Sequence, residues 1–249
     1  MTSTLFVDLD GTIMRNPFWS AVFPIVAERL AGSSGQPATA IIEMIVAESA
    51  ARKANEANAA WATDWDDIVR AVARRLGVSF DLSVEQVVID NCHPPHIAVL
   101  DDAATVLRAL ADNGWQIVAA THGQARYQVP VLKALGLLPL FADLATPDRR
   151  GCWKQQQGFW QPYLDAGGTL IHVGDLYEDD VLAPKRLGLH AVWKAKPADG
   201  VLHDADPFRR AAVIELPMQQ AVRPDAVIFH LGELPAVVSR LRQGDVKPR

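Results

Sequence analysis

The spacing of hydrophobic positions changes twice along the chain and divides it into three parts. Residues 4–8 form a short apolar run that is typical of a buried strand. Residues 16–95 carry apolar positions at helical spacing, without the alternation of a strand. From residue 96 onward, short apolar runs alternate with helical patterns. This order predicts an α/β core of residues 1–15 and 96–249, interrupted after its first strand by an all-helical cap, here called the insertion.

Four helices are expected in the insertion, from signals at their ends. Pro17 precedes the first, over 18–31, and Pro37 opens the second, over 38–60. The third helix ends at Gly77. At its start, Thr63 and Asp66 have the spacing of a capping box. Ser83 can cap the fourth helix, which runs into QVVIDN.

In the core, the apolar runs are too continuous for a sheet with one face in water. Strands that alternate with helices predict a Rossmann-like, doubly wound parallel sheet with helices on both faces. Residues 196–222 give no clear pattern. The expected strands are 4–8, 115–120, 141–146, 169–173 and 190–195, and the expected core helices are 102–114, 124–136, 155–168, 178–188 and 233–243.

The composition favours a small-molecule partner. The chain has 249 residues, 49% of them hydrophobic, and its formal net charge of −5 gives no basic surface for nucleic acid. It contains two cysteines, Cys92 and Cys152, without a CxxC pair, so neither a disulfide framework nor a zinc ribbon is expected. Neither a secretory signal pattern nor an apolar run of membrane length is evident. We expect a cytoplasmic protein that binds neither nucleic acid nor membrane, and its oligomeric state stays open.

The first apolar run stops at two aspartates, in FVDLDGT. Side chains two apart in a strand point to the same face, so Asp8 and Asp10 bring two like charges together. The pair is unfavourable unless a cation neutralises it. Two interpretations follow: a solvated strand end before a tight turn, or a metal site.

Other strand ends carry polar side chains as well. Since ligands of open parallel sheets bind at the carboxyl ends of the strands, these residues are expected to meet at one edge. A lysine lies between two of these strands, in GCWKQQQ. The residues concerned are Thr121 and His122, Lys154, Gly174 and Asp175, and then Asp179 and Asp180.

The order of these groups resembles the haloacid dehalogenase-like (HAD) hydrolase superfamily. Its first motif, DxDGT, is matched by residues 8–12, and the Ser or Thr of its second motif by Thr121. The lysine of its third motif is matched by Lys154, and its acidic fourth motif by residues 174–180. The resemblance covers essentially the whole chain, and it includes the place of the insertion, since many members carry a helical cap between the first two motifs.

The resemblance implies phosphoryl transfer to an aspartate. Asp8 would be the nucleophile that forms an aspartyl-phosphate, and Asp10 would act as general acid and base. Mg²⁺ suits this task because it prefers oxygen ligands. Asp8 and Asp175 would hold the ion by their side chains, and Asp10 would hold it by its main-chain carbonyl.

Further roles follow for the remaining groups. Thr121 would hydrogen-bond a phosphoryl oxygen, and Lys154 would offset negative charge around Asp8. Lys133 is the rival lysine, but it lies inside a predicted helix. His122, where the family commonly has Asn, would offer its main-chain N–H to phosphate or its ring to substrate, unless it is simply packed or exposed. Gly11 would let the chain turn away.

Asp179 and Asp180 are not separated by spacing, since either one fits the fourth motif. One of the two would complete the surroundings of the metal ion, and we favour Asp180 for this role. The other would only cap the helix that follows.

We expect a Mg²⁺-dependent phosphatase that acts on a small phosphorylated metabolite. The alternatives are a dehalogenase, which needs no second acid such as Asp10, a sugar-phosphate mutase or phosphotransferase on the same site, and a binding protein on an inactive HAD scaffold. The segment 92–96, CHPPH, lacks a fourth ligand for zinc. Trp19, Trp61 and Trp65 are interpreted as packing residues of the insertion rather than pocket residues.

Overall fold

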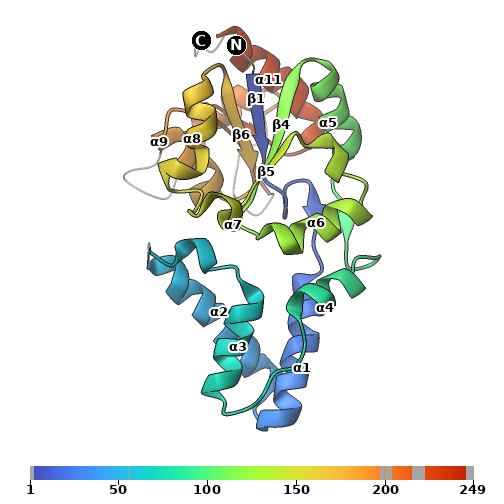
Figure 1. The fold of residues 1–249 in the computed structure, drawn as a ribbon. Coiled ribbons are helices and arrows are strands. Elements are labelled where there is room, and N and C mark those ends of the chain that lie inside the picture. The colour runs from blue at the N-terminus through green and yellow to red at the C-terminus, as the bar shows by residue number, and fades with distance from the viewer. Residues whose placement is uncertain (1–2, 56, 197–198, 200–203, 215–221, 245–249) are drawn as a thin grey trace.

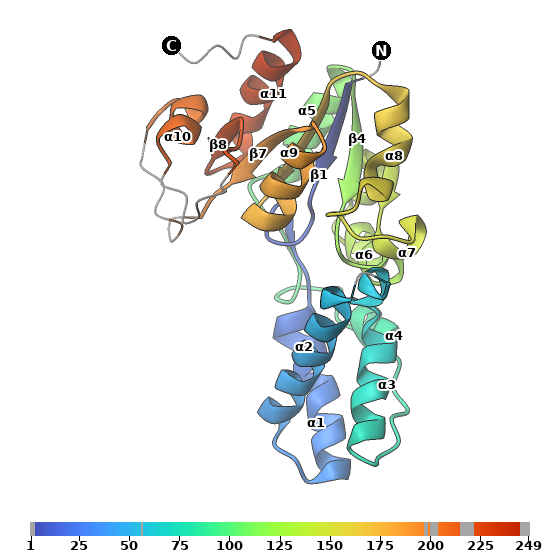
Figure 2. The ribbon, with the colours of Figure 1, turned by 90° about the vertical axis from the view of Figure 1, so that its left-hand side faces the viewer.

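The computed structural model of the protein describes residues 3–55, 57–196, 199, 204–214 and 222–244. Within them, an α/β core and a helical insertion form two lobes, and the insertion lies beyond one end of the sheet (Figures 1 and 2). No helix in this part of the chain combines the length and the apolar character needed to cross a bilayer.

The core is built on six parallel strands, as the alternating pattern predicted. Their order is β5-β4-β1-β6-β7-β8, so that β1 lies at the centre between β4 and β6. The chain winds outward from β1 in both directions, and the point where the order reverses is therefore at β1. The strands are β1 (Ser3–Val7), β4 (Trp115–Ala120), β5 (Asp143–Ala145), β6 (Leu170–Gly174), β7 (His190–Lys194) and β8 (Ala226–Ile228).

Both faces of the sheet are covered, which explains the continuous apolar runs. Leu5 and Val7 of β1 pack on one face with α5 (Ala103–Asp112), α6 (Ala125–Ala134) and α11 (Leu234–Gln243). Phe6 packs on the other face with α8 (Gln157–Ala166) (Figure 1). The doubly wound architecture is confirmed.

Some core elements differ from the prediction. Strand β8 was missed; it follows segment 196–222, which shows no clear pattern. The helix expected over 178–188 is a wide helical turn, Tyr177–Leu182, followed by α9 (Ala183–Arg186). Part of segment 196–222, namely 197–198, 200–203 and 215–221, lies outside the described residues. The other short elements are α7 (Pro147–Arg150), α10 (Pro207–Val213) and the turns Leu138–Leu140 and Leu231–Glu233.

The regular elements in the described part of the insertion are helices and helical turns, as predicted. Its elements are the turn Phe18–Val22, α1 (Phe23–Ser34), α2 (Ala38–Ala54), the turn Ala59–Trp61, α3 (Trp65–Arg75) and α4 (Val84–Asp90).

The ends of two of these helices test the capping signals. Ser83 caps α4 as predicted, since its hydroxyl accepts a hydrogen bond from the α4 main chain. The prediction of a capping box at Thr63 is wrong, because Asp64 caps α3: its side chain accepts a hydrogen bond from Asp67 N at 3.0 Å. The Thr63 hydroxyl instead donates to the main-chain oxygen of His122 at 2.6 Å. Thr63 therefore joins the insertion to the core.

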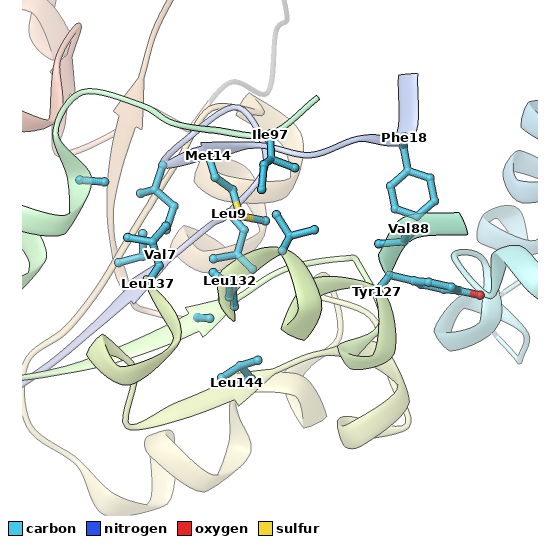
Figure 3. Packing of buried hydrophobic residues seen from close by; sticks show 14 of the residues in the cluster. Val7, Leu9, Met14, Phe18, Val88, Ile97, Tyr127, Leu132, Leu137 and Leu144 are labelled. Carbon is cyan, nitrogen blue, oxygen red and sulfur yellow. The ribbon is translucent and has the colours of Figure 1, made fainter. Parts of the chain in front are cut away.

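Two short antiparallel strands connect the lobes. β2 (Met14–Arg15) pairs with β3 (Ala98–Val99), so the chain enters and leaves the insertion side by side. A single buried apolar cluster runs from the sheet into the insertion through Met14, Phe18 and Tyr127 (Figure 3). The insertion is thus packed against the carboxyl ends of the strands.

Candidate functional site

Three buried carboxylates meet where β1 and β6 end. Asp8 follows β1, Asp175 follows β6, and Asp180 lies in the helical turn after β6. One oxygen of each lies within 4.8 Å of the others. Three like charges buried together need cations around them. Of the two candidates in the fourth motif, the structure places Asp180, and not Asp179, in this group.

Lys154 supplies one of these cations. Its Nζ is 2.7 Å from Asp8 Oδ1 and 2.8 Å from Asp180 Oδ1, and its side chain is 1% exposed. Burial by itself lowers the pKa of Lys154, but the Asp180 and Asp8 carboxylates outweigh that effect and raise this pKa above its ordinary value. The rival lysine, Lys133, is exposed near the end of α6.

Asp180 is held by several donors at once. It accepts from Lys154, from the buried His172 Nε2 at 2.8 Å and from Leu176 N at 2.9 Å. Burial raises the pKa of Asp180, but Lys154 and His172 overcome that effect and lower it. His172 was missed by sequence reasoning, although a histidine within the apolar run 169–173 was a usable signal.

Asp8 is oriented by a threonine from its own motif. Thr12 Oγ1 donates to Asp8 Oδ2 at 3.1 Å and lies 3.5 Å from Asp175 Oδ1. Burial raises the pKa of Asp8 well above its ordinary value; Lys154 opposes this shift, and the Asp180 and Asp175 charges add to it. Lys154 alone therefore does not neutralise the three carboxylates.

The donor set fits a hard divalent cation. It consists only of carboxylate oxygens, which Mg²⁺ prefers. Beside it, the ammonium of Lys196 lies 2.5 Å from Asp175 Oδ2, which shows that this oxygen already attracts a cation. Asp8, Asp175 and Asp180 are the residues that could hold the ion.

Gly11 turns the chain closely around Asp175. Its φ is +82°, and a Cβ placed there would lie 2.5 Å from Asp175 Oδ2. We expect Gly11→Ala to displace that carboxylate and to weaken Mg²⁺ binding, measured by calorimetry, at least about tenfold.

Gly35 provides a matched control for this substitution. Its φ is +70°, and a Cβ there would meet nothing within 4 Å. Gly35→Ala carries the same backbone penalty, about 1 kcal/mol, and should leave Mg²⁺ affinity unchanged. Equal Mg²⁺ affinities for the two variants would contradict the role of Gly11.

Asp10 stands apart from the three carboxylates and lines a cavity. Its Oδ2 accepts from Gln128 Nε2 at 2.8 Å, while its buried Oδ1 has no hydrogen-bond partner in the described part of the chain. Burial raises the pKa of Asp10 to about 6, against the hydrogen bond from Gln128. A carboxyl group with such a pKa can both give and take a proton near neutral pH. Gln128 was not predicted, because nothing in the sequence links α6 to Asp10.

Asp179 faces the insertion instead of the carboxylate group. It pairs with Lys53 of α2 at 3.4 Å and accepts from Gln155. His122 Nε2 is also 3.4 Å away, and the His122 ring lies against Trp153 with 3.8 Å between centroids. Burial, together with the Lys154 and Lys53 charges, holds the pKa of His122 well below its ordinary value. His122 is therefore a packed, neutral ring.

Thr121 lies at the end of β4, at the same edge of the sheet. It is buried, its Oγ1 accepts from Gly123 N at 3.1 Å, and it lines the cavity together with Asp8 and Asp10. The structure thus brings the predicted residues from the ends of β1, β4 and β6 to one place.

The cavity lies between the insertion and the core and measures about 270 Å³. Asp8, Asp10 and Thr121 lie on its core side, and Trp19 and Trp65 belong to the wall contributed by the insertion. The interpretation of the tryptophans as packing residues rather than pocket residues is wrong for Trp19 and Trp65, since both line the cavity and Trp19 is 67% exposed. Trp61 is also half exposed and does not line the cavity.

Two lysines missed by sequence reasoning lie beside the loop that follows β1. Lys194 donates to Thr12 O at 2.7 Å and pairs with Asp101 at 3.0 Å, and Lys196 pairs with Asp175. The sequence signal that could have marked Lys194 was the position of a lysine at the end of the apolar run 190–195. Among the described residues, the group arranged to hold a metal consists of the three aspartates and includes no residue of segment 92–96.

The family model for haloacid dehalogenase-like hydrolases matches residues 2–188. No curated protein matches the chain. Among solved structures, a HAD phosphatase from Thermococcus onnurineus is similar with a TM-score of 0.69 and 22% identity, over 97% of this chain and 100% of that one.

Two further structures are similar in fold. The putative HAD-hydrolase YfnB from Bacillus subtilis, solved bound to magnesium, has a TM-score of 0.63 and 15% identity, with 95% and 98% of the two chains covered. A 2-haloacid dehalogenase from Pseudomonas syringae pv. Tomato DC3000 has a TM-score of 0.65 and 18% identity, over 96% of this chain and 99% of that one. The predicted resemblance is confirmed: with its family model matching well over half of its length, this chain belongs to the haloacid dehalogenase-like hydrolases.

Proposed function

We propose that the chain is a Mg²⁺-dependent phosphatase that hydrolyses a small phosphorylated metabolite by way of an aspartyl-phosphate on Asp8. The observation that carries the proposal is Asp10, whose second oxygen is buried, unpaired within the described residues and part of the cavity wall. A dehalogenase has no use for a second acid there, because a halide leaves without a proton. An alkoxide leaving group, in contrast, needs one.

The positions of the side chains support the following reaction. An oxygen of Asp8 attacks phosphorus, a new phosphorus–oxygen bond forms, and the bond to the alcohol oxygen breaks. Asp10 gives its proton to that oxygen. Asp10 then takes a proton from water as the water attacks the aspartyl-phosphate, which releases inorganic phosphate and restores Asp8.

Other residues hold charge in place during these steps. The Lys154 ammonium pairs with Asp8 and limits the build-up of negative charge there. The Thr121 hydroxyl, which lines the cavity, can donate a hydrogen bond to a phosphoryl oxygen. Asp8, Asp175 and Asp180 would hold Mg²⁺, and the main-chain carbonyl of Asp10 would join them, as in related enzymes. When bound, the ion supplies positive charge that offsets the phosphoryl oxygens.

A phosphate-ester panel tests this function directly. The wild-type protein is assayed for phosphate release with Mg²⁺ and with excess EDTA, beside a series of 2-haloacids assayed for halide release. We expect ester hydrolysis that stops on chelation, and no halide release. Halide release without ester hydrolysis would establish the dehalogenase instead, and recovery of an isomerised sugar phosphate would indicate the mutase. No turnover of either series would favour the binding protein.

Asp10→Asn tests the second acid. The amide keeps the shape and the partnership with Gln128 but cannot carry the proton, so we expect kcat on alkyl phosphates to fall about 10²- to 10⁴-fold. Mg²⁺ affinity measured by calorimetry should change little, because the Asp10 side chain is outside the carboxylate group. An unchanged kcat would refute the role of Asp10.

A further inference from the structure

One wall of the cavity, contributed mainly by the insertion, is aromatic. Phe18 lies 5.8 Å from Tyr127 and 5.3 Å from Phe23, measured between ring centroids, and Phe23 lies 5.1 Å from Trp65 and 5.1 Å from Trp19. These five rings all line the cavity and form one connected cluster from the core to the insertion. Figure 3 shows its inner end, where Phe18 lies close to Tyr127. The wall therefore presents ring surfaces to whatever occupies the cavity.

No lysine or arginine lines the cavity, as far as the described residues go. His122 is neutral, as its lowered pKa indicates. The only formal charges on the lining are the aspartates at the core side, whose task is chemistry. A second anionic group on a substrate would enter this cavity without a partner, at a cost of several kcal/mol.

The polar groups of the wall are mostly engaged within the protein. Ser49 Oγ donates to Ala62 O at 2.6 Å, and Thr63 Oγ1 donates to His122 O at 2.6 Å. Asn16 Oδ1 accepts from Phe18 N at 3.0 Å. Gln128 donates to Asp10 and keeps its Oε1 without a partner in the described residues. The wall is therefore poorly equipped for a molecule with several hydroxyls.

The mouth of the cavity is apolar as well. Trp19 is 67% exposed, Leu176 is 53% exposed and Val46 is 41% exposed, and all three line the cavity. Trp19 and Val46 come from the insertion, and Leu176 comes from the core. Large apolar side chains left in water around one opening are typical of a surface that a ligand covers.

We propose that the phosphate ester cleaved by this enzyme has an uncharged, predominantly apolar leaving alcohol that carries a single ring. The ring would stack among Phe18, Trp19 and Trp65, and the phosphate would lie on Asp8. A volume of about 270 Å³ lies just below the range of ~300–1,000 Å³ common for ligand sites, which suits one ring and a phosphate. The proposal rests on the phosphatase function given above.

Two matched pairs of esters test it. Benzyl phosphate is compared with 4-(phosphonooxymethyl)benzoate, which adds only a carboxylate. Cyclohexylmethyl phosphate is compared with glucose 6-phosphate, which adds four hydroxyls and a ring oxygen. Each pair keeps a phosphate on a primary alcohol. We expect kcat/KM to favour the apolar member at least about 100-fold in the first pair, since the carboxylate is buried unpaired, and at least about tenfold in the second.

Variants of the wall provide the second measurement. Trp19→Ala should raise KM for benzyl phosphate about tenfold or more, and Trp61→Ala should not, because Trp61 is an exposed tryptophan outside the cavity. Val46→Arg should raise kcat/KM for the carboxylate ester at least about tenfold. Val213→Arg, at a half-exposed valine of α10, is its control.

The outcomes separate this inference from the proposed function. Equal or better hydrolysis of the charged or hydroxylated esters would overturn the apolar leaving group while leaving the phosphatase intact. Insensitivity to both Trp19→Ala and Val46→Arg would overturn it too. If no ester is hydrolysed in the presence of Mg²⁺, the phosphatase falls, and the inference falls with it.

Discussion

Replacing Asp8 with asparagine is expected to lower kcat for phosphate-ester hydrolysis by ~10⁴-fold or more. The amide is nearly isosteric but is a poor nucleophile, so the aspartyl-phosphate cannot form. The remaining activity would come only from the other groups, which would still position the substrate. The measurement is phosphate release under saturating Mg²⁺, together with trapping of labelled phosphate on the wild-type protein and its absence from the variant.

The control for this result is Asp165→Asn, at an exposed aspartate of α8 that is remote from the carboxylates. It carries the same chemical change and should keep the wild-type rate. Both variants should unfold as single transitions near the wild-type midpoint. More than about a hundredth of wild-type activity in Asp8→Asn would exclude Asp8 as the nucleophile.

Lys154→Met is expected to have the largest effect on stability. The lysine side chain is 1% exposed and pairs with both Asp8 and Asp180, and its removal leaves two buried carboxylates without that cation. Breaking a buried ion pair from one side costs about 3–5 kcal/mol, which is a large part of the stability of a typical domain. We expect the midpoint of urea unfolding to fall accordingly, and activity to fall with it.

Lys133→Met is the matched control, because Lys133 is the exposed rival of Lys154 in sequence. Its effect should stay within about 0.5 kcal/mol. Saturating Mg²⁺ should recover part of the loss in Lys154→Met, since a bound cation stabilises the folded state. A Lys154→Met protein as stable as wild type would contradict the charge balance described here.

The central arrangement could be predicted from sequence because it follows from strand order. Asp8, Thr121 and Asp175 each end an apolar run, and parallel strands bring such ends to one edge. The preference for Asp180 over Asp179 agrees with the structure. Spacing alone could not decide between them, because these neighbours point in different directions from a wide helical turn. One faces Lys53 and the other faces Lys154.

Contacts between distant segments were beyond the sequence for a different reason. Gln128 reaches Asp10 across 118 positions, and nothing in its local pattern marks it. β2 and β3 are two residues long, which is too short for alternation to be visible. The aromatic cavity wall was misjudged because helical spacing places aromatic residues on a face without saying what that face meets.

The polar contacts of the insertion with the core have a consequence for turnover. Thr63 binds the main chain of His122 and Lys53 pairs with Asp179, both beside the phosphate end of the cavity, whereas the aromatic rings surround the alcohol end. Separating the insertion from the core would break these polar contacts, whereas Phe18, Phe23 and Trp65 would move together, because all three belong to the insertion. If the proposed function holds, the rate of product release and the choice of alcohol would depend on different side chains, so that substitution could alter one and keep the other.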